Sequence, residues 1–286
     1  TPGGELRLAA RARGRWRGGI ALESLRGDYQ LPQGWSRQGQ RLLGPLVGDF
    51  HWDGGRLLAR GQTSPQASYP LSFQGWWQPL QGKPWRTAPL LLQAQWQHMP
   101  LALLNPRAQL HGWLSGVARL SGPLAKPLLV ADLDLDQPGI GPLQWRERWS
   151  GRWQPGLLTL QAPGAQLRAQ WTGQRLMALD LERGLGSLQL RPRGGGYRWQ
   201  GRQLPLNPLH LQLAGRPALP VDGELSGQGQ LALAPFGLKG ALELNQPALA
   251  WIRGRRLELR GQLRPPGFDL AGSLQPLARG QFNFSG

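Results

Sequence analysis

The sequence predicts an all-β protein: an elongated, repetitive, curved antiparallel sheet with little or no helix. Three observations lead to this class. Apolar and polar residues alternate with a period of two, turn residues recur every ten or so positions, and helical periodicity is nearly absent. The chain contains 42 Gly and 26 Pro, which favour turns, but its 14 Trp argue against disorder. Frequent turns and many apolar side chains are most compatible with short strands.

The alternation continues from one end of the chain to the other. Leu209, Leu211 and Leu213 alternate with polar residues, and Leu257 and Leu259 do the same. Because successive strand side chains point to opposite faces, each such segment has one apolar and one polar face. The sequence therefore predicts half-buried strands throughout.

Turn residues divide these segments regularly. Pro-Gly pairs such as Pro155–Gly156 and Pro163–Gly164 suit tight turns, because Pro presets the first central residue and Gly tolerates positive φ. The Gly194–Gly196 run precedes a strand-like segment and is predicted to be a hairpin turn. At this spacing we expect about 20 strands.

An internal repeat is visible. The segment Gly112–Leu120 is echoed by Gly223–Leu231, and each is followed by a turn and another alternating segment. Repeats of this kind stack neighbour on neighbour. We expect residues 1–286 to form a single elongated β-repeat region, with a weak division near 97–110, and to be a piece of a larger protein.

The charge of the chain predicts polyanionic neighbours. Lys and Arg together number 33 against 16 Asp and Glu, which gives a net charge of +17. Such an excess suits lipid headgroups, lipopolysaccharide or nucleic acid. The arginines are spread along the chain instead of forming one stripe, which argues against nucleic acid as a partner. The absence of Cys excludes disulfides and thiolate metal sites.

No constellation of catalytic residues can be assembled from the sequence. The four His residues are isolated, and no nucleophile elbow or phosphate-binding loop is present. One acidic row could be a cation site of oxygen ligands, but a solvent-facing strand explains it better: Asp132, Asp134 and Asp136. The sequence thus predicts that the protein is not an enzyme and has no catalytic, metal or cofactor-binding residues.

The repeat resembles that of the TamB family, the AsmA-like envelope-spanning proteins that include cyanobacterial and chloroplast-translocon relatives. The family pattern is a Gly, an apolar residue, Ser or Thr, Gly, an alternating strand, a Gly-Pro-type turn and another strand. The segments Leu114–Pro127 and Gly223–Leu244 match it, in what would be the middle repeat region of such a protein.

The resemblance implies a β-taco, a long sheet folded over so that its apolar face lines a groove. It also implies a periplasmic protein of Gram-negative bacteria that bridges the two membranes. Its inner-membrane anchor would lie outside this chain. Implied roles are phospholipid transport and outer-membrane protein assembly, with phospholipid acyl chains and an outer-membrane Omp85-type barrel protein as partners. No cofactor is implied.

The candidate site is an apolar groove without a specific pocket. The alternative is a structural or surface β-solenoid, resembling a β-helix, whose interior is filled. Hydrophobicity alone selects the groove-lining candidates, which are Leu133, Leu135, Leu211, Leu213, Leu242, Leu244, Leu257 and Leu259.

Overall fold

The computed structural model is almost entirely antiparallel β-sheet, with 79% of residues in strands and 3% in helices. The predicted all-β class, with an antiparallel repetitive sheet, is therefore confirmed. The structure describes residues 2–3, 6–16, 20–32, 35–37, 40–53, 55–65, 67–79, 84–104, 109–173, 175–212, 218–233, 236–249, 252–264, 267–277 and 282–285.

One sheet holds 21 strands, close to the number expected from the turn spacing. Its strands are β2 (Arg7–Trp16), β3 (Ile20–Leu31), β6 (Leu46–Asp53), β7 (Arg56–Thr63), β8 (Leu71–Trp77), β9 (Pro89–Pro100), β10 (Leu110–Pro123), β11 (Leu128–Ile140), β12 (Leu143–Trp145), β13 (Arg148–Gln154), β14 (Leu157–Ala162), β15 (Ala165–Thr172), β16 (Arg175–Arg183), β17 (Gly186–Arg193), β18 (Gly196–Pro205), β19 (Leu209–Leu211), β20 (Leu219–Leu233), β21 (Phe236–Leu249), β22 (Ile252–Arg264), β23 (Gly267–Pro276) and β24 (Phe282–Ser285).

A second, three-stranded sheet and two short 3₁₀ helices complete the described secondary structure. The small sheet has the strand order β1-β4-β5. Its bounds and those of the helices are β1 (Pro2–Gly3), β4 (Trp35–Arg37), β5 (Gln40–Leu43), η1 (Trp85–Thr87) and η2 (Leu101–Leu103).

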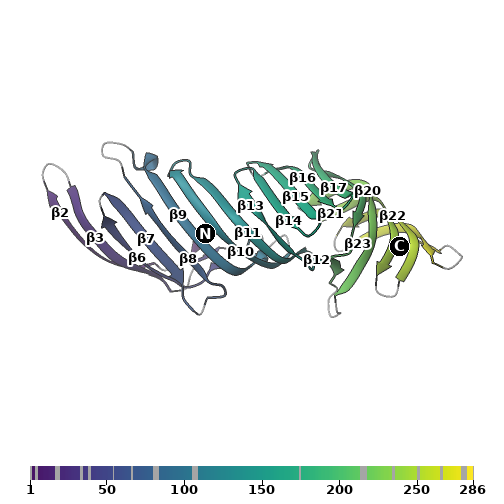
Figure 1. The fold of residues 1–286 in the computed structure, drawn as a ribbon, viewed down its shortest axis with the longest axis horizontal. Coiled ribbons are helices and arrows are strands. Elements are labelled where there is room, and N and C mark those ends of the chain that lie inside the picture. Colours follow the sequence, from purple (N-terminus) through teal and green to yellow (C-terminus); the bar gives the residue numbers. More distant parts are fainter. Residues whose placement is uncertain are drawn as a thin grey trace. The chain divides into compact units, whose positions relative to one another are not determined.

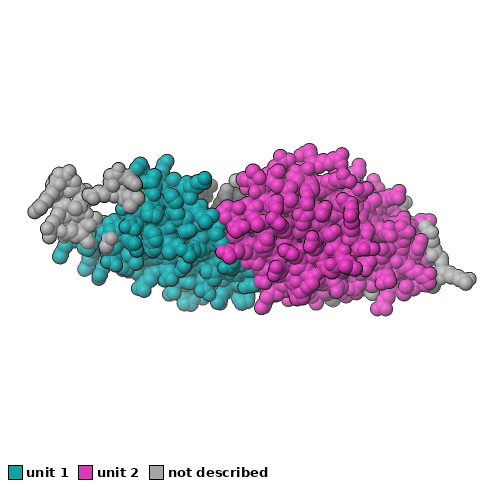
Figure 2. Space-filling view, turned by 45° about the horizontal axis from the view of Figure 1, so that its top comes forward, with its two compact units in different colours: residues 1–103, 113–134 teal, residues 104–112, 135–286 magenta. Residues whose placement is uncertain are grey.

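The chain forms two compact units, which Figure 2 shows in different colours. Unit 1 comprises residues 1–103 and 113–134, and unit 2 comprises residues 104–112 and 135–286. The chain thus passes from one unit to the other after residues 103, 112 and 134. Each unit is described by itself below.

In unit 1 the strands of the long sheet form a meander, in which β2 pairs with β3, β3 with β6, and β6 to β10 each with the next. In Figure 1 the strands β3, β6, β7, β8 and β9 run side by side. The register keeps residues of one kind on one face across many strands. One such apolar row joins Gly27, Phe50, Ala59, Gly75, Leu92 and Leu120 from β3 to β10.

The neighbouring row, on the other face of the same strands, is polar. It joins Asp28, Asp49, Arg60, Gln74, Gln93 and Arg119. A one-residue slip would exchange the two faces, so the alternating pattern fixes the register. The half-buried strands predicted from the alternation are therefore present in unit 1.

Aromatic rings on the apolar face of unit 1 lie over glycines of neighbouring strands. A Cβ added at Gly48 or Gly61 would come within 2.2–2.3 Å of the Tyr29 hydroxyl oxygen. The Tyr29 ring also stacks with Phe73, with 6.4 Å between ring centroids. A ring that covers a strand glycine compensates for the missing side chain. Glycine is required here because the ring occupies the space of a side chain.

Unit 2 closes part of the sheet into a ring. Strand β11 pairs with both β12 and β13, β12 pairs with β19, and β18 and β19 both pair with β20. The four short strands β14, β15, β16 and β17 connect β13 to β18 through consecutive antiparallel pairings. The hydrogen-bonded ladder therefore returns to its starting strand.

The turns of this ring are those predicted from the sequence. Gln154 pairs with Leu157 across Pro155–Gly156, and Ala162 pairs with Ala165 across Pro163–Gly164. The run Gly194–Gly196 closes the hairpin between β17 and β18, because Arg193 pairs with Gly196. These three turn predictions are confirmed.

A buried apolar cluster fills the ring. Trp149 of β13, Leu160 of β14, Leu181 of β16 and Leu204 of β18 are each 4–6% exposed and form one cluster. Because several of these strands are not neighbours in the sheet, their apolar side chains meet across the inside of the ring. Unit 2 thus has a packed core, whereas sheet pairing alone would give a single layer.

An ion pair also spans the ring. Arg183 of β16 donates to the carboxylate of Glu147, which lies between β12 and β13. The two side chains are only 10% and 12% exposed. The Arg183 guanidinium carbon lies 5.9 Å from the ring centroid of Trp149. The ion pair therefore connects the polar part of the interior to the apolar cluster.

The internal repeat has a structural counterpart. In the first copy the Ser115 hydroxyl accepts a hydrogen bond from the main-chain N–H of His98, at 3.1 Å; in the second, Ser226 accepts one from Gln203, at 2.9 Å. His98 and Gln203 have φ of 49° and 43° and lie at register shifts of the sheet. In each copy, therefore, the Ser hydroxyl accepts a hydrogen bond from a main-chain N–H that the strand pairing leaves without a partner at a β-bulge.

Candidate functional site

An in-register apolar surface of unit 2 lies on β20 to β24. Cross-strand pairing aligns Leu225, Leu244, Leu257, Leu274 and Phe282 in one row. The four leucines are half-buried, Leu225 against the core of the ring, and Phe282 is 65% exposed. Four steps between strands of about 4.8 Å give the row a length of about 19 Å.

The opposite face of these strands is polar. The neighbouring row joins Ser226, Glu243, Glu258, Ser273 and Asn283. Arg256 donates to Glu243 at 2.8 Å and lies 3.1 Å from Glu258. These strands therefore have one apolar and one charged face, as the alternation predicted.

Four of the predicted groove residues come together on this apolar face. Leu242 pairs with Leu259, and Leu244 pairs with Leu257, across the β21–β22 ladder. All four side chains are half-buried. They form a contiguous patch at the centre of the surface, although the structure does not test whether they bind lipid.

The other predicted groove residues have different surroundings. Leu135 packs against the core of the ring. Leu133 of β11 is half-buried near Gly116, and Leu211 of β19 pairs with Leu143 and Leu219. Leu213 lies outside the described residues.

The polar face of unit 1 carries a hollow of about 810 Å³. Its lining includes the polar side chains of Asp28, Asp49, Arg60, Gln74 and Gln93. Arg60 donates to the Asp49 carboxylate at 2.7 Å. Amide and charged side chains line this hollow, so it differs from the apolar groove predicted from the sequence.

The clearest electrostatic effect on these strands is at Tyr29, whose ring lies on the opposite, apolar face. Partial burial, reinforced by the negative charge of Asp49, raises the pKa of the Tyr29 hydroxyl to about 12. Both causes disfavour the tyrosinate. The hydroxyl donates to the main-chain carbonyl of Arg60 at 2.9 Å. The phenol therefore acts as a neutral structural donor at neutral pH.

The acidic row that was weighed as a cation site lies on β11. Within the described ranges no group of three or more His, Asp or Glu side chains could hold a metal ion. Asp132 and Asp134 are exposed and Asp136 is half-buried. His111 contacts the main-chain carbonyl of Gly141 at 2.7 Å, and His210 that of Pro208 at 3.3 Å.

Sequence reasoning missed a basic, glycine-rich rim at the hairpin between β17 and β18. Two hollows, of about 440 and 540 Å³, share the residues Gly194–Tyr197. Arg193 and Lys239 line the first, and Arg175 lines the second. The cations come from strands that are distant in sequence, so no local motif could have identified the rim.

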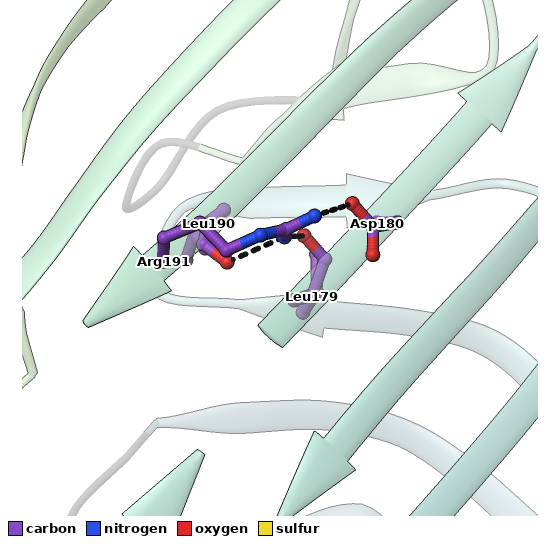
Figure 3. A network of polar contacts seen from close by, with 4 residues as sticks. All are labelled: Leu179, Asp180, Leu190 and Arg191. Carbon is purple, nitrogen blue, oxygen red and sulfur yellow. Dashed lines mark hydrogen bonds and ion pairs between the residues drawn. The ribbon is translucent and has the colours of Figure 1, made fainter. Parts of the chain in front are cut away.

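A polar network on the adjacent strands shows the usual behaviour of a surface arginine. The Arg191 guanidinium donates to Asp180 at 2.5 Å and to the main-chain carbonyls of Leu179 and Leu190 at 3.1 and 2.8 Å (Figure 3). Arg191 is thus neutralised within the sheet.

No protein-family model, curated protein sequence or solved structure matches this chain. None of the helices in the described part of the chain has the length and apolar character needed to cross a membrane.

Proposed function

We propose that the protein is a non-enzymatic phospholipid carrier that holds acyl chains along the apolar face of its sheet. The observation that carries the proposal is the row of large apolar side chains that runs in register from Leu225 to Phe282. Its length of about 19 Å is comparable with the roughly 15 Å depth of hydrocarbon in one bilayer leaflet.

The physical basis of the proposal is the transfer of hydrocarbon out of water. Each methylene group that moves onto an apolar surface contributes about 0.8 kcal/mol. A row of similar leucines offers no preferred position along its length, so an acyl chain could slide. The resemblance of the repeat to the TamB family supports the same function, in the envelope between two membranes. It also supports a role in outer-membrane protein assembly with an Omp85-type partner.

The test compares charges placed on the two faces of the same strands. Leu244→Glu with Leu257→Glu puts two carboxylates on the apolar row. Ala241→Glu with Ala271→Glu puts the same charge on exposed positions of the opposite face. Each variant is purified without detergent, checked by circular dichroism, and extracted for lipid mass spectrometry.

We expect the apolar-face variant to lose co-purifying phospholipid and the control variant to retain it. Equal lipid content in both folded variants would refute acyl-chain binding at this row. If the wild-type protein is purified without any bound lipid, acyl-chain binding at this row is refuted as well.

The filled ring of unit 2 favours a second candidate, a structural solenoid. Its interior is occupied by the cluster around Trp149 and Leu160. If a lipid-free wild-type protein were stable and well folded, this candidate would replace the carrier.

A further inference from the structure

The hairpin that joins β17 to β18 presents open main chain at its turn. Gly194 has φ of 58°, and no atom lies within 4 Å of the positions that side chains at Gly194 and Gly195 would occupy. A hollow lies on each side of the turn. The shallow floor of the first is formed partly by the small residues Gly196, Ala232 and Gly237. A ligand can therefore approach the turn closely.

The charged groups that line these hollows are all cations. Arg175, Arg193 and Lys239 belong to β16, β17 and β21, and each is exposed. Neither hollow is lined by Asp or Glu. Among the residues that the structure describes, none of the three cations forms an ion pair. Arg191, on the same strand as Arg193, does form one, with Asp180. The rim therefore has an uncompensated positive charge.

Apolar side chains line the same rim. Tyr197 of β18 pairs with Leu231 of β20, which pairs with Leu238 of β21. All three are half-buried and line the first hollow. They lie on the same face of the sheet as the row that includes Leu225 and Leu244. On β20 and on β21 the two rows are an even number of residues apart, and such residues point to the same face. The first hollow therefore lies where the apolar row of Tyr197, Leu231 and Leu238 adjoins two cations of the opposite, polar face. These cations are Arg193 and Lys239.

We propose that this rim binds the phosphate of an anionic phospholipid headgroup while the acyl chains lie on the apolar face. This inference rests on the proposed function and specifies its ligand. Arg193 and Arg175 can donate paired hydrogen bonds to phosphate oxygens, and Lys239 acts as a point charge. The chemistry is that of a phosphate anion, and the adjoining apolar row selects a phosphate attached to acyl chains.

The test uses the whole chain and two variants with the same loss of charge. Arg193→Gln with Lys239→Gln removes two rim cations. Arg253→Gln with Arg260→Gln removes two exposed cations of β22, elsewhere in unit 2. Binding is measured to phosphatidylglycerol vesicles, to phosphatidylcholine vesicles and to inorganic phosphate, with folding checked by circular dichroism.

We expect the rim variant to lose affinity for phosphatidylglycerol vesicles by about tenfold or more, since each basic residue near an anionic surface contributes substantially. The control variant should lose much less, and binding to phosphatidylcholine should be equal for all three proteins. Equal losses in the rim and control variants would overturn the proposal in favour of unspecific charge attraction. If inorganic phosphate binds saturably and as tightly as the vesicles, the site binds free phosphate, and the proposal of a lipid headgroup is overturned.

Failure of this inference is distinguishable from failure of the proposed function. If the rim variant behaves like its control while Leu244→Glu with Leu257→Glu still abolishes lipid retention, the headgroup site is refuted and the carrier function stands. If that apolar-face variant retains its lipid, the proposed function itself fails.

Discussion

In unit 1 most apolar side chains of the meander are half-buried, whereas in the ring of unit 2 several of them form a packed core. Both regions use the same alternation of apolar and polar residues. A few apolar side chains of unit 1 are buried, such as Leu46, Leu90 and Leu114, and they come from different strands. In the ring, buried side chains from several strands meet in one cluster. Alternation therefore defines two faces of a strand, and closure of the ladder decides whether the apolar face becomes a core.

This difference has a functional consequence under the carrier proposal. A packed interior excludes acyl chains, while a half-buried face can be covered by them at little cost. The strands from β21 to β24, which continue beyond the ring in the pairing order, have half-buried apolar rows like those of unit 1. The proposed lipid surface therefore belongs to the open parts of the sheet.

The strongest test of the comparison is the ion pair inside the ring. Replacing Glu147 by Ala leaves the Arg183 charge nearly buried without its partner, so we expect a loss of about 3–5 kcal/mol in the free energy of unfolding. Asp49→Ala removes the partner of Arg60 in unit 1, where the side chains are 35% and 74% exposed. There the expected loss is much smaller, because an exposed surface ion pair contributes little to stability. Urea unfolding of both variants measures the difference, and equal losses would contradict the closed interior.

A second test compares two leucines of the apolar faces. Leu160 is 6% exposed within the ring cluster, so Leu160→Ala should cost about 2–5 kcal/mol through lost burial and a cavity. Leu92 of unit 1 is half-buried in its row, and Leu92→Ala should cost clearly less, because solvent can enter the space. The same urea titrations give both values. A larger loss for Leu92 would show that unit 1 has a core comparable with that of the ring.

A third test concerns the rings that cover glycines in unit 1. Gly61→Ala places a methyl group where the Tyr29 hydroxyl lies, so we expect a loss of about 1–3 kcal/mol from overpacking. Gly55→Ala is not a suitable control because its φ is 83°; Gly195→Ala, with open space around it, is preferable. Thermal unfolding followed by near-ultraviolet circular dichroism reports both stability and the tyrosine environment. An unchanged tyrosine signal in Gly61→Ala would contradict the ring placement.

The smallest expected effect is a pH dependence from Tyr29. Its pKa is raised to about 12 in the folded protein, above the ordinary value of 10.0. A raised pKa contributes stability that is complete below pH 10 and is lost as the pH rises from about 10 to 12. Solvent around the half-buried ring limits the loss to about 1 kcal/mol or less. Urea unfolding at pH 9 and pH 11 should show this loss in the wild type and a smaller one in Tyr29→Phe; identical losses would refute it.

Much of the fold follows from local sequence. The alternation around Leu242, Leu244, Leu257 and Leu259 was sufficient to place these four side chains on one face, because strand geometry has a period of two. The Pro-Gly and Gly-Gly turns were equally local, since each depends on the φ preferences of two residues.

The functional site was only partly predictable. The basic rim combines Arg175, Arg193 and Lys239 from three strands, and cross-strand pairing alone brings them together. Leu135 has the same alternating context as the patch residues, yet it packs against the core of the ring. Hydrophobicity measures how strongly a side chain avoids water, and it does not identify which surface will cover it.

The sequence by itself thus determined the strands, their turns, their two faces and the repeat with its serine. Tertiary structure decided the rest: the closure of β12 on β19, the burial of Glu147 with Arg183, and the separation of a filled ring from open sheet. These features depend on contacts between residues far apart in the chain, such as the 36 positions between Glu147 and Arg183. Local preferences act over a few residues, and they carry no information about which distant strands will pair.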